Sequence, residues 1–129
     1  MNPSHRYEGL VDYIAGNYRN AVEIGIGHFP DVAYALLDKG IKVFATDVNP
    51  YRYRGLKVIA DDVTMPDISL YAATELLYSL RPPPELVPYM EQLARMLSVD
   101  LIVKPLASEY LSGQLHRNGD TTFSLWSSS

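Results

Sequence analysis

Short apolar segments alternate with helix-like segments along most of this sequence, and this alternation restricts the chain to few folds. Residues 21–24 include the β-branched Val22 and Ile24, whereas residues 31–39 place Val32 and Leu36 on one helical face. The same change of period recurs, and we predict strands at 21–24, 41–46, 56–60, 74–80 and 100–104 and helices at 7–18, 31–39, 67–73 and 86–97. Strands separated by helices usually pair in parallel. The sequence therefore predicts an α/β fold of three layers, with helices on both faces of a mainly parallel sheet.

Glycine and proline mark several ends of these elements. Asn118-Gly119 is the typical turn of a β-hairpin, so residues 113–117 and 121–126 are predicted to form an antiparallel pair. Pro88 lies near the start of the last predicted helix, and its missing N–H predicts an irregular first turn there. We predict one domain at 1–126, followed by a disordered tail at 127–129.

The composition excludes several classes of protein. The chain of 129 residues contains no cysteine, which excludes a disulfide framework, a thiolate zinc site and a cysteine nucleophile. It has no apolar run of about 20 residues and no apolar leader, which favours a cytoplasmic protein with no membrane association. The net charge of -4 argues against broad nucleic-acid binding, although Arg52, Arg54 and Lys57 form a small basic cluster.

Acidic residues stand at the predicted ends of three successive strands. Glu23 lies in the first strand, Asp47 follows the second, and Asp61 and Asp62 follow the third. Ligands bind outside the carboxyl ends of strands in open parallel sheets, so these side chains are predicted to share one crevice. The alternative is that they are ordinary polar residues at exposed strand ends.

The turn Gly25-Ile26-Gly27 after the first strand supplies the backbone freedom that a closely approaching ligand requires. Glycine turns sharply without a Cβ, and the amides that open the next helix point toward the same place. Asp47 follows Gly27 by 20 residues, the spacing at which an acidic residue accepts hydrogen bonds from ribose hydroxyls. The combination predicts a nucleoside site.

Two residues distinguish this loop from a dinucleotide site. The fingerprint G-x-G-x-x-G needs a third glycine where this chain has Pro30. The carboxylate of Glu23 would face a pyrophosphate unfavourably, whereas it suits a cationic α-amino group. Binding of an NAD-type nucleotide is therefore disfavoured.

The loop resembles the first motif of S-adenosylmethionine-dependent methyltransferases, acidic-x-G-x-G-x-G, and the resemblance extends over about residues 21–104. It implies that Glu23, Gly25 and Gly27 lie around the methionine moiety of the cofactor. Phe29 stands where the third glycine of the motif belongs, so the depth of the methionine pocket depends on this side chain.

The same resemblance assigns the nucleoside end of the cofactor. It implies that Asp47 binds the ribose and that Val48 packs against the adenine. It further implies that Asp62 and Val63 recognise the edge of the adenine, one through a carboxylate and the other through a backbone amide.

A more specific resemblance rests on the segment LYSLRPPPEL at residues 77–86. With residues 22–27, 45–47 and 61–63, this segment is similar to a small, largely archaeal family of uncharacterised proteins that have a methyltransferase-like Rossmann core. The resemblance implies the strand order 3-2-1-4-5 with a terminal antiparallel hairpin. It implies no activity, because the family has none assigned.

Catalytic candidates are few. Amino-group methyltransferases place an Asn or Asp before prolines after the fourth strand, where this chain has Ser79 and Arg81 before Pro82. Arg81 suits a carboxylate or phosphate, or it pairs with a neighbouring acidic residue. His28 is a candidate general base, with an exposed loop histidine as the alternative.

No metal site is predicted from the sequence. The three histidines lack metal-ligand spacing, and Asp61 and Asp62 have no further acidic ligands at suitable spacing. Glu109 lies beyond the fifth strand and is a distant candidate for lining the pocket.

We predict that the chain binds S-adenosylmethionine and leave methyl transfer to an unknown acceptor open. The alternative is a cofactor-free protein-interaction module that kept the fold, and the second alternative is NAD-type nucleotide binding. Without a substrate-recognition insert, an acceptor would have to be held by a partner subunit, or be a large molecule such as RNA or protein. Self-association also stays open.

Overall fold

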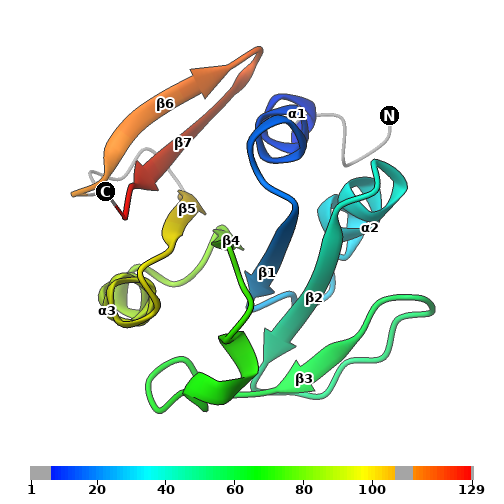
Figure 1. Cartoon of the computed structure of the whole chain (residues 1–129), viewed down its shortest axis with the longest axis vertical. Helices are drawn as coiled ribbons and strands as arrows, with labels where there is room; N and C mark the ends of the chain where they lie inside the picture. Colours follow the sequence, from blue (N-terminus) through cyan, green and yellow to red (C-terminus); the bar gives the residue numbers. More distant parts are fainter. Residues whose placement is uncertain (1–6, 107–111, 129) are drawn as a thin grey trace.

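The computed structural model describes residues 7–106 and 112–128. Its α-helices are α1 (Glu8–Asn17), α2 (Asp31–Asp38) and α3 (Val87–Leu97), and its short 3-10 helices are η2 (Ile68–Tyr71) and η3 (Pro84–Leu86). Its strands are β1 (Asn20–Ile24), β2 (Lys42–Asp47), β3 (Val58–Ala60), β4 (Leu76–Leu80), β5 (Asp100–Lys104), β6 (Gln114–Asn118) and β7 (Thr121–Trp126). They form one sheet with the order β3-β2-β1-β4-β5-β7-β6 (Figure 1).

The sheet is parallel from β3 to β5 and antiparallel beyond it. β1 pairs with both β2 and β4, and β2–β3 and β4–β5 are also parallel. β7 pairs with β5 and β6 in antiparallel fashion, so the second strand of the hairpin lies inside and the first forms the edge. The predicted order 3-2-1-4-5 and the terminal hairpin are confirmed.

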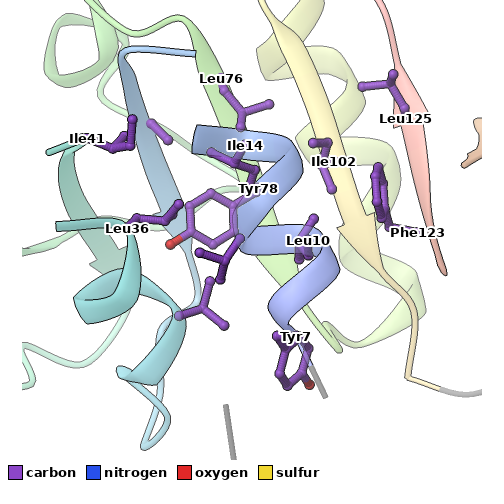
Figure 2. Packing of buried hydrophobic residues seen from close by; sticks show 13 residues of the cluster. Tyr7, Leu10, Ile14, Leu36, Ile41, Leu76, Tyr78, Ile102, Phe123 and Leu125 are labelled. Carbon is purple, nitrogen blue, oxygen red and sulfur yellow. The ribbon is translucent and has the colours of Figure 1, made fainter. Parts of the chain in front are cut away.

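Helices cover both faces of the sheet, which confirms the three-layer prediction. On one face, α1 and α2 pack against β1, β4, β5 and β7; Figure 2 shows Ile14 and Leu36 beside the ring of Tyr78. On the other face, α3 and η2 cover apolar side chains of β1, β4 and β5. The two faces alternate along each strand, so neighbouring residues of β1 enter different cores.

Two segments depart from the regular helices that periodicity predicts for them. The segment predicted as a helix at 67–73 is a single 3-10 turn at 68–71, where the carboxylate of Asp67 accepts a hydrogen bond from the N–H of Ser69. The last predicted helix begins as η3 and becomes α-helical only from Val87, with Pro88 in its first turn. Proline lacks the N–H that a regular turn would use, so the irregular start is the one expected.

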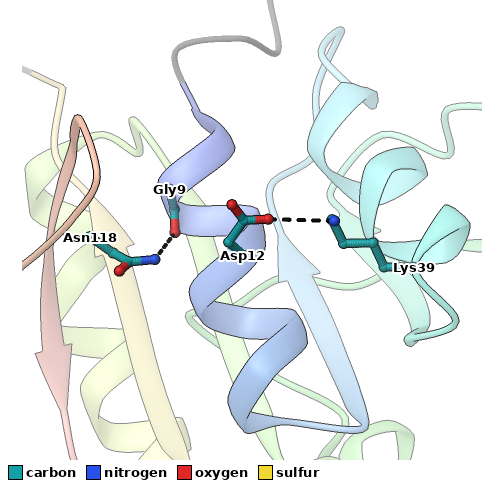
Figure 3. Close-up of polar contacts among 4 residues, drawn as sticks. All are labelled: Gly9, Asp12, Lys39 and Asn118. Carbon is teal, nitrogen blue, oxygen red and sulfur yellow. Dashed lines mark hydrogen bonds and ion pairs between the residues drawn. The ribbon is translucent and has the colours of Figure 1, made fainter.

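The hairpin is held against α1 by close backbone packing. A Cβ on Gly9 would lie 1.8 Å from the carbonyl oxygen of Asn118. The side-chain amide of Asn118 donates a hydrogen bond to the carbonyl oxygen of Gly9 at 2.8 Å (Figure 3). The same picture shows the exposed ion pair between Asp12 of α1 and Lys39 after α2, at 3.5 Å. Only glycine fits at position 9 with the hairpin in this place.

The predicted single domain at 1–126 and the disordered tail at 127–129 stay predictions. The N–H of Ser128 donates to Asp100 at 2.9 Å, and residue 129 of the predicted disordered tail lies outside the described residues. Within the described ranges, no helix combines the length and the apolar character needed to cross a membrane.

We expect Gly9→Ala to lower the free energy of unfolding by about 1–3 kcal/mol, because the added methyl group meets backbone rather than a flexible side chain. Gly16 provides the matched control on the same helix, since a Cβ there would meet nothing within 4 Å. Gly16→Ala should leave stability unchanged or raise it by up to about 1 kcal/mol. Equal unfolding midpoints of the two variants in denaturant would contradict this packing.

Candidate functional site

The carboxyl ends of the parallel strands open into two neighbouring clefts. The acidic cleft, as we call it, has a volume of about 300 Å³ and is lined by residues 24–25, 46–48, 61–63 and 79–83 together with Leu86 and Met90 of the α3 side. The aromatic cleft has a volume of about 460 Å³ and is lined by Tyr7, Glu23, Ile26, Phe29, Leu80, Arg81 and Leu106. Leu80 and Arg81 line both, so the clefts meet at the end of β4.

The glycine loop between β1 and α2 forms the border of the acidic cleft. Gly25 and Gly27 have φ angles of +74° and +53°, a region that side chains with a Cβ disfavour. The N–H of Gly25 donates to the carbonyl oxygen of Thr46 at 2.8 Å. A Cβ at either glycine would meet nothing within 4 Å, so the space beside this backbone is open.

Asp47 is held in one orientation at the end of β2. Its Oδ2 accepts a hydrogen bond from the N–H of Gly27 at 2.9 Å, and its Oδ1 accepts one from the N–H of Asn49 at 3.0 Å. Each carboxylate oxygen has two acceptor positions, so one on each remains for hydroxyl donors of a ligand. The side chain of Val48 beside it is 65% exposed.

The two acidic residues after β3 have different surroundings. Asp61 accepts hydrogen bonds from the hydroxyl of Tyr71 at 2.6 Å and the N–H of Asp67 at 3.0 Å, and so fastens η2 to the sheet. Asp62 is exposed, and hydrogen bonds from the hydroxyl and backbone N–H of Thr64 hold its pKa below the usual value. Asp62 therefore presents a charged carboxylate at the cleft, beside the buried Val63.

Glu23 does not share the acidic cleft with Asp47 and Asp62 but lines the aromatic one. Its side chain is 1% exposed, and the hydroxyl of Tyr78 donates to its Oε1 at 2.8 Å. Burial raises the pKa of Glu23 to about 8, against the smaller opposing effect of the Tyr78 hydrogen bond. The carboxyl group is therefore neutral at pH 7 in the absence of a cation.

Phe29 forms a wall of the aromatic cleft. Its ring packs against that of Tyr7 with centroids 5.4 Å apart, and it joins the core under α1 and α2. Phe29 does not line the acidic cleft. Phe29, at the position of the third glycine of the methyltransferase motif, thus narrows the aromatic cleft and leaves the acidic cleft open.

The catalytic candidates lie in three different surroundings. Ser79 is buried, and its hydroxyl donates to the carbonyl oxygen of Ile24 at 2.7 Å, an arrangement that joins β4 to β1. Arg81 is exposed between the two clefts, with a φ of +53° and its N–H bonded to the carbonyl oxygen of Lys104. His28 is exposed beside Tyr51 and lines neither cleft.

Several residues at the clefts were not predicted from the sequence. Tyr78 pairs with Glu23 in the register of β1 and β4, so correct alignment of these two strands would have placed the hydroxyl beside the carboxyl group. Tyr7 precedes α1 as its N-cap and Met90 lies in α3; their helical spacing indicates core residues and gives no sign of a cleft. Glu109 lies outside the described residues, and the described part of the chain contains no group of acidic or histidine side chains suited to a metal ion.

Comparisons with known sequences identify relatives in archaea. The model of the Uncharacterised protein family (UPF0146) matches residues 8–124. A UPF0146 protein of Archaeoglobus fulgidus is 44% identical over 108 residues, which cover 82% of this chain and 83% of that protein. One of Methanocaldococcus jannaschii is 39% identical over 98 residues, which cover 72% of this chain and 71% of that protein.

Comparisons with solved structures show the fold. A "SAM dependent methyltransferase from Archaeoglobus fulgidus" aligns with a TM-score of 0.58 at 16% identity, covering 76% of this chain and 49% of the other. A 1,6-didemethyltoxoflavin-N1-methyltransferase of Burkholderia thailandensis with bound S-adenosylhomocysteine aligns with a TM-score of 0.55 at 15% identity, covering 97% and 62%. This chain spans about half the length of the first of these structures. The methyltransferase-like Rossmann fold predicted from the sequence is confirmed.

We expect the stability of the protein to fall with rising pH because of Glu23. The unfolded state releases this proton near the usual pKa of 4.5, whereas the folded state holds it until about pH 8. Between these values the folded state binds more protons, so the free energy of unfolding falls by up to about 1.4 kcal/mol per pH unit. Glu23→Gln should remove this pH dependence, so that the variant becomes more stable relative to the wild type as the pH rises. If the free energies of unfolding of both proteins, measured in denaturant, change in parallel with pH, the carboxyl group is not buried in its neutral form.

Proposed function

The chain belongs to the uncharacterised protein family UPF0146, and we propose that it binds S-adenosylmethionine across the two clefts. The adenosyl group would occupy the acidic cleft and the amino-acid end the aromatic cleft. The observation that carries this proposal is the convergence of Gly25, Asp47 and Asp62 around one cleft that continues into a second cleft containing a buried acid.

The donors and acceptors of the acidic cleft suit an adenosine. Asp47 is fixed by backbone amides and keeps acceptor capacity for the two ribose hydroxyls. Asp62 carries a negative charge that can accept a hydrogen bond from the amino group of adenine. Open space beside Gly25 allows a ligand to lie against the backbone, and the exposed Val48 offers an apolar surface for a base.

The charges of the site suit a cationic ligand. The sulfonium and the α-amino group of the cofactor are both positive, and Asp47, Asp62 and Glu23 lie around the joined clefts. Glu23 is neutral when no cation is near, so an ammonium group in the aromatic cleft would lower the pKa of its carboxyl group, and the proton would be released to solvent. Both the Tyr78 hydroxyl and the ammonium would then donate to the same carboxylate.

Methyl transfer is the chemistry that this cofactor supplies, because its methyl group is bonded to a positively charged sulfur. The chain's own part would be to hold the ligand and to leave its methyl group open to an acceptor near Arg81, which is exposed where the clefts meet. A positioned nucleophile needs little further help.

One observation favours a cofactor-free interaction module instead. Amino-group methyltransferases place an orienting Asn or Asp before prolines where this chain has Ser79 and Arg81, and the hydroxyl of Ser79 already donates to the carbonyl oxygen of Ile24. A chain of this kind would bind no cofactor, and calorimetry separates the two functions.

We expect S-adenosylmethionine and S-adenosylhomocysteine to bind in calorimetric titration and to raise the melting temperature, whereas NAD should not. Asp47→Ala should weaken binding by about tenfold or more, since a charged hydrogen-bond acceptor is worth about 1.5–3 kcal/mol. Asp38→Ala, at the exposed end of α2, removes the same charge away from the clefts and serves as the control. If millimolar ligand gives neither heat nor a shift in melting temperature, the proposal is rejected.

We also expect binding to release close to one proton at pH 7, because Glu23 starts neutral and ends ionised. Calorimetry in two buffers with different ionisation enthalpies measures this number directly. Glu23→Gln should bind without proton release and more weakly. Equal proton release by wild type and variant would place the ammonium elsewhere.

A further inference from the structure

The loop between β2 and β3 combines aromatic and basic side chains and directly follows Asp47 and Val48, which line the acidic cleft. Residues 49–58 contain Arg52, Arg54 and Lys57 and no acidic residue, in a chain with a net charge of -4. All three cations are exposed. Among the described residues, no ion pair involves any of them. The loop is therefore a local positive surface on an acidic protein.

Tyrosines alternate with the arginines in this loop. The rings of Tyr51 and Tyr53 are stacked, with an angle of 23° between planes and 6.4 Å between centroids. The ring of His28 meets Tyr51 edge-on at 4.8 Å. These tyrosines are half-buried against the core that contains Leu56, so part of each side chain faces solvent.

Side-chain hydrogen bonds fasten the loop beside the glycine turn. The hydroxyl of Tyr53 donates to the carbonyl oxygen of Gly27, and the hydroxyl of Tyr34 donates to the carbonyl oxygen of Arg54 at 2.7 Å. A β-bridge also joins Tyr53 to Leu56. The loop thus keeps its shape without a ligand, which lowers the entropy cost of binding one.

We propose that residues 49–57 and His28 form a binding surface for single-stranded nucleic acid next to the acidic cleft. The arginines and Lys57 would contact phosphates, and the aromatic group would stack on unpaired bases. Duplex nucleic acid fits poorly, because its bases are already stacked on one another. The net charge of the protein excludes broad binding, so affinity has to come from this surface.

Aromatic stacking distinguishes a single-stranded nucleic acid from an acidic peptide as the ligand of this surface. Phosphates and carboxylates both attract the three cations, but only a nucleic acid also supplies flat rings for Tyr51 and its neighbours. Binding at this surface does not require the cofactor. Cofactor titration and nucleic-acid binding can therefore fail independently.

The first test is fluorescence anisotropy of the full chain with labelled oligouridine, oligothymidine and a duplex, over a series of salt concentrations. We expect both single strands to bind more tightly than the duplex and to weaken with salt. Arg52→Ser/Arg54→Ser should lower affinity by about tenfold and reduce the salt slope by about 1.4, at about 0.7 per lost phosphate contact. A preference for oligouridine would indicate contacts with the 2′-hydroxyl or rejection of the thymine methyl group, and equal affinities would indicate recognition through phosphates and the faces of the bases.

The control for charge is Lys42→Ser/Arg95→Ser, which removes two exposed cations at the start of β2 and the end of α3. It should bind nearly as well as the wild type. The control for stacking compares Tyr51→Leu, which should weaken binding by about tenfold, with Tyr51→Phe, which keeps the ring and should bind normally. Circular dichroism checks that each variant is folded.

Three results would overturn the proposal. The first is that neither single strand binds at low salt. The second is that Lys42→Ser/Arg95→Ser loses as much affinity as Arg52→Ser/Arg54→Ser. The third is that polyglutamate displaces the oligonucleotides as effectively as unlabelled oligouridine does. The last result would assign the surface to acidic peptides.

Discussion

The carboxyl end of β1 is the point on which both clefts depend. β1 pairs with β2 from Asn20 to Ile24, but its register with β4 covers only Val22–Leu77 and Glu23–Tyr78. Beyond that pair the hydroxyl of Ser79 donates a hydrogen bond to the carbonyl oxygen of Ile24, and the N–H of Gly25 donates one to the carbonyl oxygen of Thr46. Side-chain and turn hydrogen bonds therefore replace the ladder where the strands diverge. The carbonyl oxygen of Ile24 and the N–H of Gly25 thus both have hydrogen-bond partners where the sheet opens.

Two features that cost stability lie at the same opening. Glu23 is a carboxyl group buried in an apolar core, and its ionisation is suppressed by that burial. Arg81 holds a positive φ, which side chains other than glycine adopt only at a cost. A fold built for stability alone would place an apolar residue at position 23 and a glycine at position 81. Their position beside the clefts supports a binding role more directly than the likeness of the fold does.

Much of the fold follows from sequence pattern, because each element has a distinct period and a clear end. The five parallel strands, the hairpin at Asn118-Gly119 and the irregular turn before Pro88 are examples. The site is harder, because it depends on the face to which each side chain points. Glu23 and Ile24 are neighbours in sequence, but Ile24 lines the acidic cleft whereas Glu23 lines the aromatic one, where the pairing of β1 with β4 places the hydroxyl of Tyr78 beside it. Asp61 looks equivalent to Asp62 in sequence, yet it accepts a hydrogen bond from Tyr71, which lies in a 3-10 turn where the sequence predicts a longer helix.

The distribution of charge narrows the class of ligand more than the shape of the clefts does. A dinucleotide would bring a pyrophosphate close to the carboxylates of Asp47 and Asp62, and like charges at short range are unfavourable. The aromatic cleft contains a buried acid, Glu23, and a base at its border, Arg81. A ligand whose end carries both an ammonium and a carboxylate group can form an ion pair with each of these two residues, whereas a nicotinamide has neither of these groups. The charge pattern therefore supports the proposed ligand, a nucleoside with an amino-acid end, independently of the glycine motif.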